Sequence, residues 1–473
     1  MVSTLETQPT SHRYLPAVDE VPASGERSPN QCLLPLTATV SEQDHLVVGG
    51  CDVPDLVTRY GSPLYILDET TLRAACRQYR QALATHYPGD ALVLYASKAW
   101  NCLAVCAVAA SEGVGIDVVS AGELHTALQA GVSPGVIYFH GNNKSVDELV
   151  MALEAGCRVV VDNWYELRTL AQLATDQGKT VPMLIRLTPG IECHTHEYIR
   201  TGHLDSKFGF DPDQVEAVFE FISQQSALHC IGLHAHIGSQ IFELQPHGDL
   251  AGVLVSWFCK AQQYGLPVAE LDVGGGLGIR YTEGDDPPSI ATWVETVAKG
   301  IAAACEAQGI TPPRLLCEPG RSLIGPACVT AYTVGSQKTV PGIRTYVAVD
   351  GGMSDNPRPI TYQSQYRSLV ANRMAAPLSE TVTLAGKHCE SGDVVIADAP
   401  LPPLETGDVV VVAGTGAYNY SMASNYNRVP RPAAVMVANG EAHLVIQRET
   451  LQDLVRHDCL PAHLQPPGAG LGH

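Results

Sequence analysis

Lys98 ends the apolar run LVLYASK (92–98), and a lysine in that place is partly shielded from water. Loss of solvation lowers the pKa of an amine and favours a nucleophile that can form a Schiff base with a carbonyl group. The alternative is a lysine that points into solvent beyond the end of its strand. Lys98 alone leaves both interpretations open.

A glycine run, GGGLG (274–278), follows another apolar segment and is typical of a loop whose backbone amides hold a phosphate group. The dinucleotide motif G-x-G-x-x-G would require a glycine at position 279, where this chain has Ile279. The pattern therefore argues against a Rossmann-type dinucleotide site. We expect one bound phosphate rather than two.

Glu318 and Arg321 lie together in CEPGR (317–321), at the end of a further apolar run. A carboxylate there can pair with a protonated ring nitrogen, and an arginine can bind a substrate carboxylate. An internal salt bridge between the two side chains is the structural alternative.

Histidines supply two further candidate groups. His234 and His236 in HAHIGS (234–239) are two residues apart, so they share one face of a strand. They could serve zinc, although no third ligand is near in sequence, or one imidazole could stack on a cofactor ring. Cys193, His194, His196 and His203 match no compact zinc spacing, so we expect no metal there. Cys102 and Cys106, four apart on an apolar helix, are expected in the core.

Eight apolar runs position these groups, and helix-like stretches separate the runs. Ser145 is the predicted N-terminal cap of one of these helices. Uninterrupted apolar runs indicate strands buried on both faces, as in a parallel sheet, and eight such units fit a closed (β/α)8 TIM-like barrel. The runs are LVLYASK (92–98), IDVVS (116–120), VIYFH (136–140), RVVVD (158–162), PMLIRLT (182–188), CIGLHAHIGS (230–239), AELDVGGG (269–276) and RLLCEPGR (314–321).

Chemistry in such a barrel lies at the carboxyl ends of the strands. Those ends carry polar or glycine residues although the strand interiors are apolar: Lys98, Asp117, His140, Asp162, Arg186, His236, Gly274–Gly276 and Glu318. One or two of them could be structural ion pairs. A structural role does not account for all eight, so the sequence predicts a functional site at this face.

Beyond Arg321 the pattern changes to strands joined by turns, which predicts a mostly antiparallel C-terminal β domain. The early run 45–68 is expected to add a strand to it. We therefore predict four parts: a disordered tail (1–35), a segment that joins the β domain (36–67), the barrel (68–325) and the β domain (326–473).

Composition narrows the range of partners. The chain of 473 residues has 29 basic and 49 acidic side chains, a net charge of −20, which argues against nucleic acid or an anionic membrane as the main partner. An anionic small ligand needs only a local positive site and stays possible. No secretory signal, transit peptide or apolar run of roughly 18 residues is present. We expect a cytoplasmic protein whose 14 cysteines are mostly free thiols.

The motifs resemble, in order and spacing, those of the barrel-fold (fold-type III) pyridoxal-phosphate (PLP) decarboxylases. The resemblance spans about residues 45 to 450, and no single motif would carry it. The matching segments are YASKA around Lys98, TGHLDSKFGF (201–210), HAHIGSQ (234–240), DVGGGLG (272–278), CEPGR (317–321), NPRPITYQSQY (356–366), CESGD (389–393) and GAYNYSMASNYN (416–427).

The resemblance implies a role for each matching residue. Lys98 would bind PLP covalently, His236 would stack on its ring and Glu318 would pair with its ring nitrogen. The phosphate end would be bound by Ser239, Gly274, Gly275, Gly276 and Tyr418. Arg321, Arg358 and Tyr362 would bind a distal substrate carboxylate. Cys389, a candidate proton donor, and Glu390 would enter the active site of the partner subunit in a homodimer.

The implied reaction is that of a carboxy-lyase which converts meso-2,6-diaminopimelate at its D-centre into L-lysine and carbon dioxide, the last step of lysine biosynthesis. Two alternatives remain: a decarboxylase of ornithine, arginine or carboxynorspermidine, or a non-catalytic PLP-binding regulator. RPITY (358–362) argues against the first, and Lys98 with Cys389 against the second. The chain departs from the family at Trp100, Glu197 and Ala434, none of them a catalytic position, and Trp100 lies close to the cofactor lysine.

Overall fold

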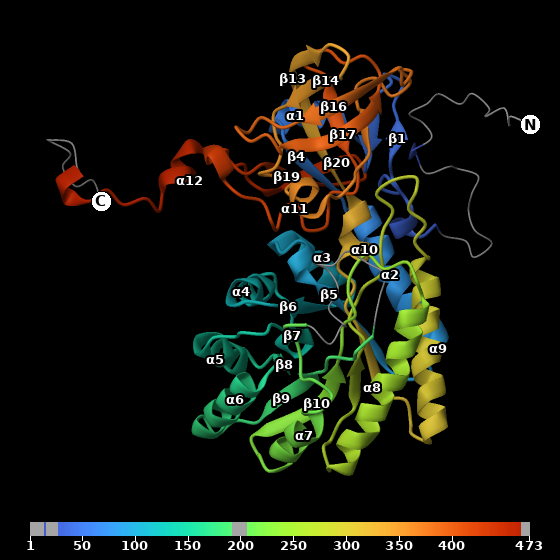
Figure 1. Ribbon diagram of the computed structural model, residues 1–473, viewed down its shortest axis with the longest axis vertical. Helices are drawn as coiled ribbons and strands as arrows, with labels where there is room; N and C mark the ends of the chain where they lie inside the picture. The colour runs from blue at the N-terminus through green and yellow to red at the C-terminus, as the bar shows by residue number, and fades with distance from the viewer. Residues whose placement is uncertain (1–13, 16–26, 192–205, 465–473) are drawn as a thin grey trace, which may run out of the picture.

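The computed structural model describes residues 14–15, 27–191 and 206–464. A barrel and a β domain lie end to end along the long axis of the molecule, with the β domain above the barrel in Figure 1. From residue 39 the chain forms strands on the side of the β domain, crosses to the barrel, and returns to the β domain after the last barrel strand.

Eight parallel strands form the closed barrel, in the order β10-β11-β12-β5-β6-β7-β8-β9, which confirms the predicted (β/α)8 fold. Each strand lies within or overlaps one of the eight predicted runs. They are β5 (Ala91–Ala96), β6 (Gly115–Val118), β7 (Ile137–Phe139), β8 (Arg158–Val161), β9 (Val181–Arg186), β10 (Leu228–His234), β11 (Glu270–Asp272) and β12 (Arg314–Cys317).

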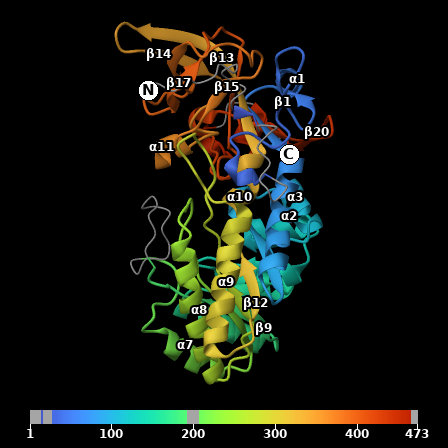
Figure 2. The ribbon, with the colours of Figure 1, turned by 90° about the vertical axis from the view of Figure 1, so that its right-hand side faces the viewer.

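Helices cover the outside of the barrel, and α8 and α9 run side by side along its wall in Figure 2. The predicted Ser145 cap is confirmed: Ser145 and Glu148 form a reciprocal capping box at the start of α5. The helices are α2 (Glu69–His86), α3 (Leu103–Ser111), α4 (Ala121–Gln129), α5 (Val146–Ala155), α6 (Trp164–Asp176), α7 (Val215–Ser223), α8 (Gln245–Gln263), α9 (Ile290–Gln308) and the short α10 (Arg321–Ile324).

The inside of the barrel is layered. Five buried side chains form an apolar layer: Leu94, Tyr138, Val160, Leu184 and Leu316. Side chains alternate along a strand, so the residue two positions further on faces the same way. This rule places a polar group directly above four members of the layer: His140, Asp162, Arg186 and Glu318. The ring of polar residues at the strand ends is therefore a direct result of strand periodicity.

The β domain is built on a nine-stranded sheet. Its pairs are mostly antiparallel, as predicted, with two parallel pairs, β4 with β19 and β14 with β16. The strands are β4 (Leu64–Asp68), β13 (Cys328–Val340), β14 (Arg344–Val349), β15 (Ser368–Val370), β16 (Glu380–Ala385), β17 (Val394–Leu401), β18 (Val409–Val412), β19 (Ala433–Ala438) and β20 (Glu441–Ile446).

The N-terminal segment contributes to this domain. Strand β4 lies between β13 and β19, which confirms the expected added strand. A small sheet of β1 (Thr39–Val40), β2 (Leu46–Val48) and β3 (Cys51–Asp52) and the helix α1 (Val53–Tyr60) precede it, and α11 (Arg358–Tyr362) and α12 (Leu451–Val455) complete the domain.

Part of the segment 1–35, which the sequence predicted to be a disordered tail, is packed against the rest of the protein. Asn30 is fully buried, and its side-chain amide donates to the carbonyl oxygens of Gly278 at 3.1 Å and Pro288 at 2.9 Å. Leu34 is likewise fully buried. The polar composition of the segment suggested that it is exposed to solvent. Asn30 is buried nevertheless, because its side-chain amide donates to backbone carbonyl groups and not to water.

Trp100 joins the two domains. Its indole stacks on Tyr420 of the β domain, with ring centroids 5.6 Å apart, and contacts Tyr65 of β4 at the same distance. The ring is fully buried within this aromatic cluster. The departure at position 100 is thus accommodated at the domain junction.

Among the described residues, no helix is long and apolar enough to cross a membrane.

Candidate active site

A cavity of about 730 Å³ opens at the carboxyl ends of the barrel strands, facing the β domain. Its volume suits a ligand of cofactor size together with a small substrate. Nine of the residues to which the family resemblance assigns a role line it: Lys98, His236, Ser239, Gly276, Glu318, Arg321, Arg358, Tyr362 and Tyr418.

Lys98 lies in the short 3₁₀ helix η3 (Ser97–Ala99) directly after β5 and is accessible from the cavity. The β domain fixes this turn, because the Tyr418 amide donates to the carbonyl oxygen of Ala99 at 2.7 Å. Tyr418 adopts a left-handed backbone, with φ of 71°, to make that contact.

The charge state of Lys98 differs from the sequence prediction. Burial lowers the pKa of the amine, as predicted, but Asp117, Tyr418 and Glu318 more than offset that effect and raise the pKa above its ordinary value. The prediction of a lowered pKa is therefore wrong for the free lysine. Strand order placed these oxygen groups beside it, which a single run could not reveal.

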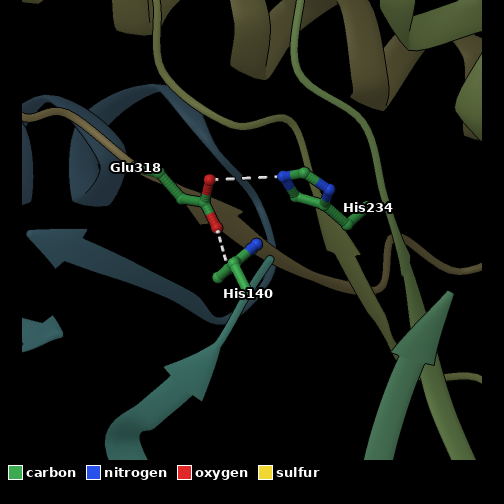
Figure 3. Close-up of side chains that lie close together, drawn as sticks. All are labelled: His140, His234 and Glu318. Atoms are coloured by element: carbon green, nitrogen blue, oxygen red, sulfur yellow. Dashed lines mark hydrogen bonds and ion pairs between the residues drawn. The ribbon is translucent and has the colours of Figure 1, made fainter. Parts of the chain in front are cut away.

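Glu318 lies between two histidines, as Figure 3 shows. His140 Nε2 is 2.7 Å from Glu318 Oε1, and His234 Nε2 is 3.2 Å from Glu318 Oε2. All three residues are buried. Burial alone raises the pKa of the Glu318 carboxyl, but the two histidines outweigh it and hold that pKa well below its usual range. The carboxylate is thus kept anionic in a buried place.

The histidine pair was considered from the sequence as a zinc site. The ligand atoms of His140, His234 and Glu318 lie within 4.8 Å of one another, so this cluster, rather than His234 with His236, has the spacing for a metal. Within it, both histidines lie close to the Glu318 carboxylate. Desolvation lowers the pKa of His234 to about 4, so this ring is neutral at pH 7 and donates its Nε2 proton to Glu318.

The glycine run makes the turn after β11. Gly274 and Gly276 have positive φ angles, 65° and 125°, and a Cβ on Gly275 would lie 2.3 Å from the carbonyl oxygen of Glu318. The Gly274 amide donates to Asp272 Oδ1 at 2.9 Å and the Gly275 amide to His236 Nδ1 at 3.2 Å. Gly276 lines the cavity, so it is the member of the run placed to meet a ligand.

Arg321 and Arg358 converge on one phenol. Each donates from Nη1 to the hydroxyl oxygen of Tyr281 at 2.7 Å. Arg321 also donates from Nε and Nη2 to Ser239 Oγ, at 3.2 and 3.0 Å, and Arg358 to the Tyr366 hydroxyl at 3.0 Å. Both guanidinium groups are buried and line the cavity, where they create a strongly positive region.

Cys389 and Glu390 lie elsewhere. Both are exposed, on the connection between β16 and β17, and neither lines the cavity of this chain. Two contacts hold the segment: the Cys389 amide donates to Asn427 Oδ1 at 2.8 Å, and His388 Nδ1 is 2.7 Å from Asp393 Oδ2. Residues 193, 194, 196 and 203 of the second cysteine–histidine group fall outside the described residues.

The cysteines are as expected where they are described. All 13 cysteines in the described ranges are free thiols. Cys106 is buried in the barrel core and the half-buried Cys102 packs against that core, which confirms their assignment.

Sequence reasoning assigned no specific role to two residues of the site. His140 was seen only as a strand end, although its position two residues beyond the inward-facing Tyr138 was a sufficient signal for an inward side chain. Tyr281 carried no signal, because it lies in an irregular loop and its arginine partners are 40 and 77 residues away in sequence.

Comparisons with known proteins agree with this geometry. The profile described as "Pyridoxal-dependent decarboxylase, pyridoxal binding domain" matches residues 69–325. A diaminopimelate decarboxylase of Synechocystis sp. is 62% identical over 472 residues, which is 98% of this chain and 100% of that protein. The diaminopimelate decarboxylase of Bacillus subtilis is 47% identical over 89% of this chain and 97% of its own length.

A solved structure shares the whole fold. The diaminopimelate decarboxylase of M. jannaschii, crystallised with L-lysine, superposes with a TM-score of 0.84 and is 30% identical, covering 93% of this chain and 100% of that one. The barrel is thus matched by the profile, and both the barrel and the β domain are matched by sequence and by structure. The chain belongs to the diaminopimelate decarboxylase family of pyridoxal-dependent decarboxylases.

Proposed function

We propose that this enzyme decarboxylates meso-2,6-diaminopimelate at its D-centre and releases L-lysine and carbon dioxide. The observation that carries the proposal is the buried arginine pair: Arg321 from the barrel and Arg358 from the β domain both reach the cavity that contains Lys98 and Glu318. Two guanidinium groups suit a substrate with a second carboxylate at its far end. The similarity to diaminopimelate decarboxylases supports the same substrate.

The residues of the cavity fit PLP. Lys98 is accessible within it, Glu318 is an anion that would pair with a protonated ring nitrogen, and Gly276 and Ser239 line the same cavity and would bind the phosphate. His236 lies against the glycine turn beside them. When bound, PLP supplies an electron sink for the charge left on the α-carbon as carbon dioxide departs.

The protein side of the mechanism follows from these positions. Lys98 would hold the cofactor covalently, and its amine lies where the cavity gives access to it. Glu318 stays anionic because His140 and His234 stabilise its charge, so it would hold a proton on the cofactor's ring nitrogen. Asp117, which helps raise the pKa of Lys98, favours the protonated form of the free amine, so Lys98 would be able to return a proton to the α-carbon.

Orientation comes from the far end of the substrate. Arg321 and Arg358, with Tyr362 beside them in α11, anchor the distal carboxylate. Anchoring that carboxylate would fix the orientation of the leaving carboxylate at the reacting end. Binding energy at a remote group is used in this way to align the reacting bond.

We further propose a homodimer with shared active sites. Cys389 and Glu390 are exposed and absent from the lining of their own cavity, which leaves them free to enter that of a partner subunit. There Cys389 would donate a proton to the α-carbon, in competition with Lys98, and Glu390 would contact the substrate.

Two alternatives predict different pockets. A decarboxylase of ornithine, arginine or carboxynorspermidine would present an acidic group to a distal amine. Within the described ranges, the acids that line this cavity are Asp117, Asp285 and Glu318, and Asp285 already accepts from the backbone amides of Tyr281 and Thr282. A non-catalytic PLP-binding regulator would have no use for Cys389 as a proton donor beside Lys98.

Carbon dioxide release from meso-diaminopimelate, ornithine, arginine and carboxynorspermidine, measured side by side with the holoenzyme, tests the proposal. Diaminopimelate should be the preferred substrate, and Arg358→Gln should lower its kcat/KM by about a hundredfold or more, as expected for loss of a buried charged contact. Arg344→Gln, which alters an exposed arginine on β14, is the control and should match the wild type. Faster release from any of the other three would refute the substrate assignment.

A further inference from the structure

Tyr281 is the residue on which the two arginines of the cavity meet, and nothing above gives it a role toward the substrate. It lies in the loop between β11 and α9, five residues beyond Gly276. The side chain is buried, lines the cavity, and packs edge-on against Tyr366, with ring centroids 5.3 Å apart. It therefore belongs to the barrel yet contacts an arginine and a tyrosine of the β domain.

The hydrogen bonds that Tyr281 accepts leave its hydroxyl group able to act only as a donor toward a further partner. A phenol has two acceptor positions and one proton to donate. Arg321 and Arg358, each at 2.7 Å, fill both acceptor positions. Among the described residues no acceptor takes the proton, so a neutral Tyr281 can give it only to a ligand or to water in the cavity.

The two neighbouring guanidinium groups make the Tyr281 hydroxyl a strong hydrogen-bond donor. Burial raises the pKa of Tyr281, but the two guanidinium groups more than offset burial and lower the pKa below its ordinary value. A donor of this kind, held between two cations, is suited to an anionic oxygen. It offers nothing to an ammonium group.

We propose that the Tyr281 hydroxyl is a third ligand of the distal substrate carboxylate, donating to it from between Arg321 and Arg358. The inference rests on the proposed function and extends it by assigning a residue that selects for a carboxylate at that end. Tyr281 also keeps the two guanidinium groups at a fixed separation before substrate arrives, because both are bound to the same oxygen.

Tyr366 provides a matched comparison. Its hydroxyl also accepts from Arg358, at 3.0 Å, but it directs its own proton to Asn419 Oδ1 at 3.4 Å. Removal of the Tyr366 hydroxyl deprives an arginine of an acceptor without removing a donor from the cavity. Tyr281→Phe removes both.

The test uses L-lysine and cadaverine, which differ by the one carboxylate. Binding of each to the holoenzyme is measured by calorimetry for the wild type, Tyr281→Phe and Tyr366→Phe. We expect Tyr281→Phe to weaken L-lysine about tenfold, the size of one hydrogen bond to a charged group, and to leave cadaverine within about twofold. Tyr366→Phe should change L-lysine by less than about threefold.

The outcomes separate the two proposals. Equal weakening of both ligands by Tyr281→Phe, unchanged binding of L-lysine, or equal effects of the two variants on L-lysine would each overturn the role of Tyr281. A wild-type enzyme that binds cadaverine as tightly as L-lysine would instead remove the distal carboxylate site, and with it the proposed function. Circular dichroism of each variant establishes that a loss of binding does not come from unfolding.

Discussion

His140 Nε2 lies 2.7 Å from Glu318 Oε1, although β7 and β12, the strands that precede these residues, are not neighbours in the barrel. The contact crosses the interior of the barrel, where both side chains are buried. A carboxylate in that place keeps its charge only if a donor or cation is close. His140 meets this need together with His234.

His140→Gln should therefore weaken PLP binding. Loss of the imidazole allows the pKa of Glu318 to rise toward the value that burial alone would set, so the carboxylate holds a protonated ring nitrogen less firmly. We expect about a tenfold higher Kd for PLP, the equivalent of one pKa unit, measured by absorbance titration of the apoenzyme. His125→Gln, at an exposed position on α4, is the control. An unchanged Kd would mean that His234 alone supports Glu318.

Lys98→Ala should abolish the covalent attachment of PLP. The measurement is borohydride reduction of the holoenzyme followed by peptide mass spectrometry, which locates the modified lysine. Lys207 also lines the cavity and is the sharpest control, because Lys207→Ala should keep the adduct on Lys98. A PLP adduct that persists in Lys98→Ala, or one found on Lys207 in the wild type, would contradict the assignment.

Shared active sites predict complementation between two inactive variants. Lys98→Ala and Cys389→Ala should each lose most turnover when pure. In a hybrid dimer one site carries both changes and the other neither, so an equal mixture re-equilibrated after mild dissociation should recover about a quarter of wild-type activity. Turnover assays before and after mixing measure this. If each Cys389 served its own subunit, mixing would restore nothing.

Because His247 is buried and neutral in the folded protein, we expect the free energy of unfolding to fall at mildly acidic pH. It is buried behind the glycine run against Trp293, and desolvation lowers its pKa to about 4 from an ordinary value of 6.5. As the pH falls below 6.5 the unfolded chain binds a proton that the folded chain refuses, so stability falls until about pH 4. At pH 5 this residue should cost about 2 kcal/mol relative to pH 7.5.

Urea unfolding of the wild type and His247→Gln at the two pH values checks this prediction. His234 and the other shifted groups are common to both proteins and cancel in the difference of the two pH dependences. His457→Gln, at an exposed position, should keep the wild-type pH dependence. Identical pH dependences for wild type and His247→Gln would show that His247 is protonated in the folded protein.

The periodicity of side chains along strands explains which parts of the fold and of the site could be predicted from the sequence. Apolar runs that end in a polar residue predicted eight parallel strands and the polar ring at their carboxyl ends, because side chains alternate along a strand. The same rule would have directed His140 inward. It could not predict its partner, since the contact with Glu318 depends on closure of the barrel.

The state of Lys98 and the position of Tyr281 required the folded chain. Desolvation is a local effect and could be argued from one run, which predicted a lowered pKa for Lys98. The opposing charge of Asp117 comes from the next strand, Glu318 from the last one and Tyr418 from the β domain, and together they reverse the sign. Tyr281 acquired its partners in the same way, from a barrel helix and from α11.

The sequence by itself determined the barrel, the β domain and the set of residues that bear the chemistry, because strand periodicity and ordered motifs are properties of the linear chain. Tertiary structure alone decided which of those residues meet: Glu318 with His140, Arg321 and Arg358 on Tyr281, and Cys389 away from its own cavity. Electrostatic interactions depend on distance through space. Groups separated by scores of residues therefore set each other's charge only after folding brings them together.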